Sequence, residues 1–225
     1  MTDTVFSGVE LLPESVNPRQ LFILLHGFGT NAADMVPLAE RFRSAYPDAA
    51  FLIPEGTYAL GESGTRRQWF DIEGVAEDNR PQRIADAMPA LLTLVRQAQD
   101  RLKILSSDTA LVGFSQGGIM ALEFSSRHDG NAGRILVFSG RYGKLPEVAP
   151  ELTTIHLFHG ELDRVIPVDH AYAAYAALTD LQGDVTLDLA ADCGHEITDA
   201  LIDKAVSRLQ TCVPLRSWKR ALDSA

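Results

Sequence analysis

Short apolar runs alternate with helical patterns along the whole chain, and this alternation strongly restricts the folds that the chain can adopt. Several of the runs are apolar on both faces, among them Leu21–Leu25 and Ile135–Phe138. Strands of this kind suit the middle of a parallel sheet that helices cover on both sides. We therefore expect an α/β domain with a mostly parallel central sheet of about seven strands.

The expected strands are Val5–Leu12, Leu21–His26, Ala50–Pro54, Thr109–Gly113, Arg134–Ser139, Thr154–His159 and Val185–Ala190. The expected helices are Asp34–Ala45, Arg83–Leu105, Gln116–His128, Val168–Leu181 and Glu196–Cys212. Pro89 falls within one of these helices, where a proline predicts a kink or a late start. The segment Gly56–Pro81 has few regular patterns, and long irregular loops of this kind are often functional.

The composition is that of one globular domain. The chain has 225 residues, of which 46% are hydrophobic and 22% are charged, and no repeat or linker-like run divides it. We expect a single domain over residues 1–225, in which 213–225 form a C-terminal tail. Nothing in the sequence favours a monomer over a homodimer.

The net charge of -10 bears on the partners that the protein can bind. A strongly negative surface repels nucleic-acid phosphates and anionic lipids, so we expect neither as a partner, and the basic pair Arg66-Arg67 is too small to reverse this. The sequence predicts no signal peptide and no integral membrane association, which favours a cytoplasmic location. Cys193 and Cys212 lack the spacing of a metal site, and we expect no metal and no cofactor.

Gly113-Phe114-Ser115-Gln116-Gly117 has the Gly-x-Ser-x-Gly spacing of a nucleophile elbow. An apolar run precedes it and a helical pattern follows, which is the strand-turn-helix context that such an elbow needs. The two glycines would let the strand and the helix approach closely. The alternative is a glycine-rich turn that carries a serine by chance.

A serine nucleophile needs a base to take its proton and an acid to orient that base. Ser115, Asp163 and His195 occur in the chain order Ser, Asp, His that is typical of α/β-hydrolases, and each follows an expected strand. The alternatives are less well placed, because they lie inside expected strands or helices or in other turns: His26, His128, His156, His159 and His170 for the base, and Asp169, Asp188 and Asp192 for the acid.

An acyl-transfer serine also needs donors for the oxyanion that forms during the reaction. The backbone N–H of Gln116, directly after the serine, would be one donor. We expect the other to be the N–H of Phe28, in the turn after an early strand. A turn that places a core phenylalanine is compatible with this role, because only the backbone is involved.

The chain resembles the phospholipase/carboxylesterase group of α/β-hydrolases, which includes the acyl-protein thioesterases, and it is especially similar to small bacterial cytosolic esterases. The matching segments span most of the chain: Leu25-His26-Gly27-Phe28-Gly29, Trp69-Phe70-Asp71, Gly113–Gly118, Phe138-Ser139-Gly140, His159-Gly160 with Asp163 and Val165-Ile166-Pro167, and Gly194-His195-Glu196. The resemblance implies an α/β-hydrolase fold and the same triad and oxyanion donors. It also implies that Trp69-Phe70-Asp71 borders the site.

We expect Trp69, Phe70, Val165 and Ile166 to line a substrate pocket, although the two aromatic residues could equally be core residues. No insertion is large enough for a separate lid domain. The polar residues after Gly140 and in the 56–67 loop weaken a long-chain lipid assignment. We therefore expect a carboxylesterase for short to medium acyl chains, acting on a small ester or thioester. The alternatives are an acyl thioesterase, a lysophospholipase, a dienelactone-type hydrolase and a non-catalytic binding module.

Overall fold

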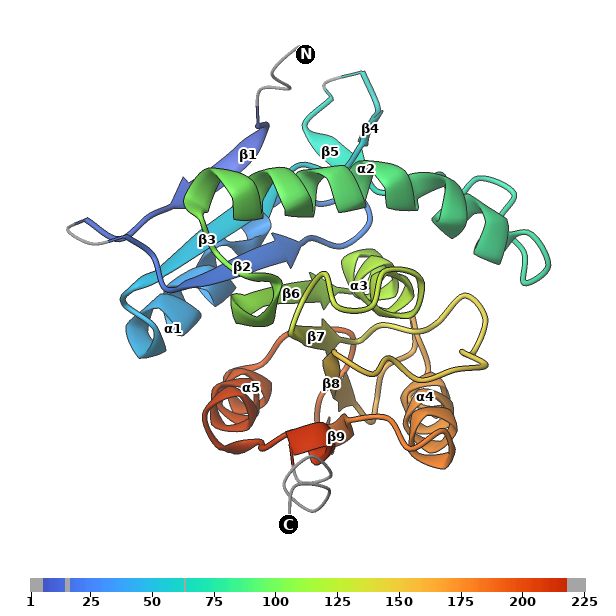
Figure 1. Cartoon of the computed structure of the whole chain (residues 1–225). Helices are drawn as coiled ribbons and strands as arrows, with labels where there is room; N and C mark the ends of the chain where they lie inside the picture. The colour runs from blue at the N-terminus through green and yellow to red at the C-terminus, as the bar shows by residue number, and fades with distance from the viewer. Residues whose placement is uncertain (1–5, 15–16, 63, 218–225) are drawn as a thin grey trace.

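The computed structural model describes residues 6–14, 17–62 and 64–217. In this part of the chain, seven strands form one sheet in the order β1-β3-β2-β6-β7-β8-β9 (Figure 1). Strand β1 is antiparallel to β3, and every other neighbouring pair is parallel. The strands are β1 (Gly8–Leu11), β2 (Gln20–Leu25), β3 (Ala49–Pro54), β6 (Thr109–Phe114), β7 (Arg134–Phe138), β8 (Thr154–Gly160) and β9 (Val185–Ala190). The predicted α/β class and the mostly parallel sheet are confirmed, and Val5 lies outside the described residues.

Helices cover both faces of this sheet. They are α1 (Val36–Ala45), α2 (Arg80–Leu102), α3 (Gln116–Arg127), α4 (Asp169–Asp180) and α5 (Asp199–Thr211). Helices α2, α3 and α4 pack on one face, and α1 and α5 pack on the other (Figure 1). Along β2, Leu21 and Ile23 point into the first of these cores and Phe22 points into the second. The double-sided apolar pattern of the strand is thus explained by burial on both faces.

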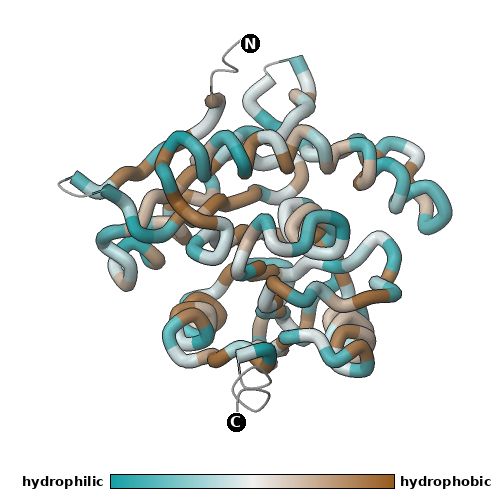
Figure 2. Tube along the Cα trace, in the orientation of Figure 1, coloured by the Kyte–Doolittle hydropathy of each residue, from teal (hydrophilic) through white to brown (hydrophobic). Residues whose placement is uncertain are grey.

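Helix α2 begins three residues before the expected start and runs through Pro89 without a break. The prediction of a late start was therefore wrong. Pro81 lies in the first turn, where its fixed φ and missing N–H suit a helix start. Pro89 lies on the exposed side of the helix, where water can replace the backbone hydrogen bond that proline removes. Figure 2 shows hydrophilic and hydrophobic residues alternating along α2, as expected for a helix with one buried face.

The expected irregular loop contains a short hairpin, which the sequence analysis missed. Its strands are β4 (Tyr58–Leu60) and β5 (Arg66–Gln68), and they pair with each other in an antiparallel arrangement. Arg67 also forms a β-bridge with Thr30, in the turn that follows β2. The hairpin therefore fixes one of the turns at the carboxyl edge of the sheet. Within the described residues, no helix is both long enough and apolar enough to cross a membrane.

Candidate active site

Three polar side chains meet at the carboxyl edge of the sheet, where ligands bind in parallel α/β folds. Ser115 follows β6, Asp163 follows β8 and His195 follows β9. The hydroxyl oxygen of Ser115 lies 2.8 Å from Nε2 of His195, and Nδ1 of His195 lies 2.7 Å from Oδ2 of Asp163. A carboxylate only accepts hydrogen bonds, so Nδ1 carries the proton and Nε2 is free to accept one from the serine. The arrangement can therefore act as a nucleophile, a base and an orienting acid.

Ser115 occupies a strained backbone conformation with φ 54° and ψ -115°. Its N–H donates to the carbonyl of Phe138, which fixes the turn between β6 and α3. A Cβ at Gly113 would lie 2.2 Å from the carbonyl oxygen of Gly117, and a Cβ at Gly117 would lie 2.1 Å from that of Leu25. Both positions therefore require glycine, which confirms the reason given for the Gly-x-Ser-x-Gly spacing. Strain of this kind is characteristic of a nucleophile elbow.

The carboxylate of Asp163 is fully buried yet well supplied with hydrogen-bond donors. Its Oδ1 accepts the backbone N–H groups of Val165, at 2.8 Å, and of Ile166, at 2.9 Å. Burial alone would raise the pKa of Asp163, but the hydrogen bonds from His195, Ile166 and Val165 outweigh it and lower that pKa. Asp163 is therefore ionised at neutral pH and can stabilise a charged His195.

The alternative acids and histidines occupy different positions in the fold. Asp188 forms ion pairs with Arg208 and Lys204, and Asp169 lies in the first turn of α4. Of the five alternative histidines, His26 and His156 are buried, His128 caps α3, and His170 contacts Arg141. The fifth, His159, is buried and lies close to Asp163.

The turn after β2 lies directly against the serine. A Cβ built on Gly27 would be 3.5 Å from the Cβ of Ser115. Within the described residues, neither the N–H of Phe28 nor that of Gln116 donates a hydrogen bond. The N–H of Gln116 belongs to the first turn of α3, where backbone donors have no partner inside the helix. Both donors are thus free of partners within the described residues, and their role as an oxyanion hole stays a prediction.

The side chain of Gln116 holds the elbow against the hairpin, a contact that the sequence analysis did not foresee. Its Oε1 accepts the N–H of Trp69 at 2.8 Å, and its Nε2 donates to the carbonyl of Phe70 at 2.8 Å. The indole N–H of Trp69 donates to the carbonyl of His26, also at 2.8 Å. One buried network therefore connects the elbow, the segment after β5 and the turn after β2. No local pattern could have revealed it, because the partners lie more than forty residues apart.

The four residues expected at the pocket have different environments. Trp69 and Phe70 are buried in the core between the sheet and α2. Val165 is 67% exposed, and Ile166 is buried. Their contact with substrate stays a prediction.

His26 is a structural residue of the turn after β2. Its Nδ1 donates to the carbonyl of Gly27 at 2.7 Å, and its Nε2 accepts the N–H of Gly56 at 2.9 Å. Burial lowers the pKa of His26, so the ring is neutral and its tautomer is fixed by these two contacts. Among the described residues, no three or more side chains of His, Cys, Asp or Glu are grouped so that they could hold a metal ion.

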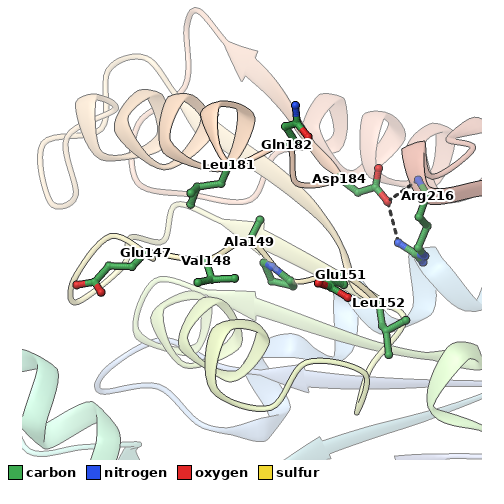
Figure 3. Close-up of a pocket in the computed structure, with 10 residues that line it drawn as sticks. Glu147, Val148, Ala149, Glu151, Leu152, Leu181, Gln182, Asp184 and Arg216 are labelled. Atoms are coloured by element: carbon green, nitrogen blue, oxygen red, sulfur yellow. Dashed lines mark hydrogen bonds and ion pairs between the residues drawn. The ribbon is translucent and has the colours of Figure 1, made fainter. Parts of the chain in front are cut away.

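A surface groove lies at the opposite, amino-terminal edge of the sheet. It is bordered by the 147–152 segment, the end of α4, Asp184 and Arg216, and the last two residues form an ion pair (Figure 3). Leu152 and Asp184 come just before β8 and β9, whereas the candidate active site lies beyond the other ends of those strands. The groove is thus separate from the three convergent side chains.

Comparison with known proteins identifies the family of the chain and several similar structures. A family model described as Phospholipase/Carboxylesterase matches residues 9–213. Esterase YpfH of Escherichia coli (strain K12) is 41% identical over 204 residues, which cover 91% of this chain and 88% of that protein. Among solved structures, esterase PE8 is 29% identical with a TM-score of 0.81, over 92% of this chain and 99% of that one. The Bacillus cereus carboxylesterase shares the fold, with a TM-score of 0.76 at 18% identity, over 92% of this chain and 95% of that one.

Proposed function

Since the chain belongs to the phospholipase/carboxylesterase family and is a carboxylesterase-type hydrolase, we propose that it cleaves its esters with Ser115 as nucleophile, His195 as general base and Asp163 as orienting acid. The observation that carries this proposal is the continuous hydrogen-bonded chain from Ser115 through His195 to Asp163. The strained elbow and the ionised, buried acid support it.

In the proposed reaction, His195 removes the proton of Ser115 as the serine oxygen attacks the ester carbonyl. The N–H groups of Phe28 and Gln116 stabilise the tetrahedral oxyanion. His195 then gives its proton to the leaving alcohol, and the acyl-enzyme forms. A water molecule, activated by the same histidine, hydrolyses that intermediate and restores the serine. Asp163 holds His195 in the required tautomer and stabilises its charged form.

We propose short to medium acyl chains for the substrate. The apolar side chains on the turns around Ser115 are partly open to solvent: Phe28 is 38% exposed, Leu162 is 60% exposed and Val165 is 67% exposed. Exposed side chains of this kind offer an apolar surface near the nucleophile without enclosing a long chain. A long acyl chain would gain more from an enclosed apolar pocket than from such a surface.

The test combines a serine variant with a substrate panel. Ser115→Ala should abolish turnover while leaving the thermal unfolding transition in place, because only one oxygen atom is removed. A fluorophosphonate probe should label the parent protein and fail to label the variant. Near-normal ester hydrolysis by Ser115→Ala would overturn the proposal. Short aryl esters, acyl thioesters, lysophospholipids and lactones, compared on the parent, would separate esterase activity from the other hydrolase activities of this class.

A further inference from the structure

His159 is a second histidine at the acid of the candidate triad. It lies near the end of β8 and is almost completely buried. Its Nε2 lies 2.8 Å from the carbonyl oxygen of Ile166 and 3.3 Å from Oδ2 of Asp163. That carboxylate oxygen is the one that accepts the proton of His195. One oxygen of Asp163 is therefore approached by two imidazole rings.

The contacts fix the protonation of His159. A carbonyl oxygen only accepts hydrogen bonds, so Nε2 must carry the hydrogen. Burial lowers the pKa of His159, and the ring is neutral at neutral pH. Its single N–H donates mainly to Ile166 and is also directed toward the Asp163 carboxylate.

Both backbone polar groups of Ile166, its N–H and its carbonyl, are hydrogen-bonded. Its N–H donates to Oδ1 of Asp163, and its carbonyl accepts the hydrogen of His159. Backbone bonds from Glu161 to Ala190 and from Leu162 to Cys193 fix the start of the same loop. In the part of the chain that the structure describes, the Ile166 carbonyl accepts no other hydrogen bond, so His159 is what connects this carbonyl to β8.

We propose that His159 is a positioning residue, whose Nε2–H holds the loop of Asp163 so that the carboxylate meets His195 in the catalytic geometry. This inference rests on the proposed function, because it assumes that Asp163 orients the base. His159 does not touch the reacting atoms. Since His195 serves both formation and hydrolysis of the acyl-enzyme, loss of the donor should slow both steps together and lower kcat with little change in KM.

The variants that test this replace the donor in graded ways. His159→Gln places an amide N–H close to the position of Nε2 and should retain most of the turnover. His159→Asn places its amide nearer the position of Nδ1, and His159→Leu removes the donor. Both variants should therefore have a lower kcat. His156→Leu is the matched control, because His156 is buried in the same strand and its Nδ1 contacts Thr186 instead.

The measurement is kcat on a short aryl ester, divided by the number of serines that a fluorophosphonate probe titrates. This division removes any loss that is due to unfolded protein. We expect kcat per titrated site to decrease roughly 10- to 100-fold in His159→Leu and His159→Asn. This is the range observed when a residue that orients a metal-binding side chain through a hydrogen bond is removed, and we apply it to Asp163 by analogy. His159→Gln and His156→Leu should stay within about threefold of the parent.

Three results would overturn the inference: parent-like kcat per site in both His159→Leu and His159→Asn, an equal loss in His159→Gln, or an equal loss in His156→Leu. If His159→Leu does not fold, the contrast between the Gln and Asn variants decides. The failure of the proposed function would look different, because Ser115→Ala would then still turn over substrate. An inactive Ser115→Ala combined with fully active His159 variants would reject only the role of His159.

Discussion

At the scale of single residues, the candidate site contains a strained backbone at Ser115 and a desolvated carboxylate at Asp163. Contacts with the surrounding structure stabilise both. The positive φ of Ser115 costs about 1–3 kcal/mol for a residue other than glycine. The buried carboxylate of Asp163 is tolerated only because backbone and imidazole donors surround it. Both features cost stability locally, and the proposed roles of Ser115 as nucleophile and Asp163 as orienting acid would explain both.

Asp163→Asn should decrease kcat by roughly 10⁴-fold, because an amide can present a donor to His195 and so favour the wrong tautomer. The measurement is steady-state turnover of a short aryl ester by folded protein, with circular dichroism as the check on folding. Asp192→Asn is the matched control, since Asp192 lies on the same edge of the sheet and is exposed. Parent-like turnover in Asp163→Asn would show that another group orients His195.

At the scale of elements, the close approach of β6, α3 and β2 determines the position of Ser115. Glycine at 113 and 117 lets the first turn of α3 lie against the ends of the two strands. The hairpin β4–β5 then holds the turn after β2 through the bridge between Thr30 and Arg67. The position of Ser115 is therefore set by contacts between elements and not by the elbow alone.

Gly117→Ala should destabilise the fold by about 3 kcal/mol or more, because its Cβ would lie 2.1 Å from a backbone oxygen that cannot move freely. Urea denaturation followed by tryptophan fluorescence measures the change in the free energy of unfolding. Gly194→Ala is the control, because a Cβ there meets no atom within 4 Å. Equal stability of the two variants would contradict this explanation of the elbow glycine.

At the scale of the whole molecule, the sheet separates two hydrophobic cores, and buried histidines lie among its strands and turns. Burial, together with the charges of Arg134 and Arg208, lowers the pKa of His156 from 6.5 to about 3. Burial likewise lowers the pKa of His26 and of His159. The folded protein keeps these rings neutral under conditions in which an unfolded chain would protonate them.

The free energy of unfolding should therefore fall as the pH decreases from about 6.5 toward 3. In that range the unfolded chain binds a proton at His156 that the folded protein does not bind, which costs up to about 1.4 kcal/mol per pH unit. Urea denaturation at several pH values measures the slope. In His156→Leu the slope of the free energy of unfolding against pH should be smaller by up to about 1.4 kcal/mol per pH unit, which corresponds to one proton. An unchanged slope would mean that His156 does not contribute.

The amino-acid sequence by itself determined the seven strands of the sheet, the five helices to within about three residues at each end, and the order Ser115, Asp163, His195. These features depend on local pattern, because a doubly buried strand is apolar throughout and a tight strand-to-helix turn needs glycine. The late start that Pro89 predicted for α2 was wrong, because an exposed helix face can accommodate a proline.

Only the tertiary structure decided the hairpin β4–β5, the network of Gln116 with Trp69, and the second imidazole at Asp163. The hairpin pairs two short strands across a loop. The other two features are contacts between side chains of different elements, and these form only when the chain has folded. A hydrogen bond requires its donor and acceptor to be about 3 Å apart. The periodicity of a sequence does not predict which distant residues come that close. The sequence could therefore name the candidate residues, while the fold supplied the contacts that hold them in position.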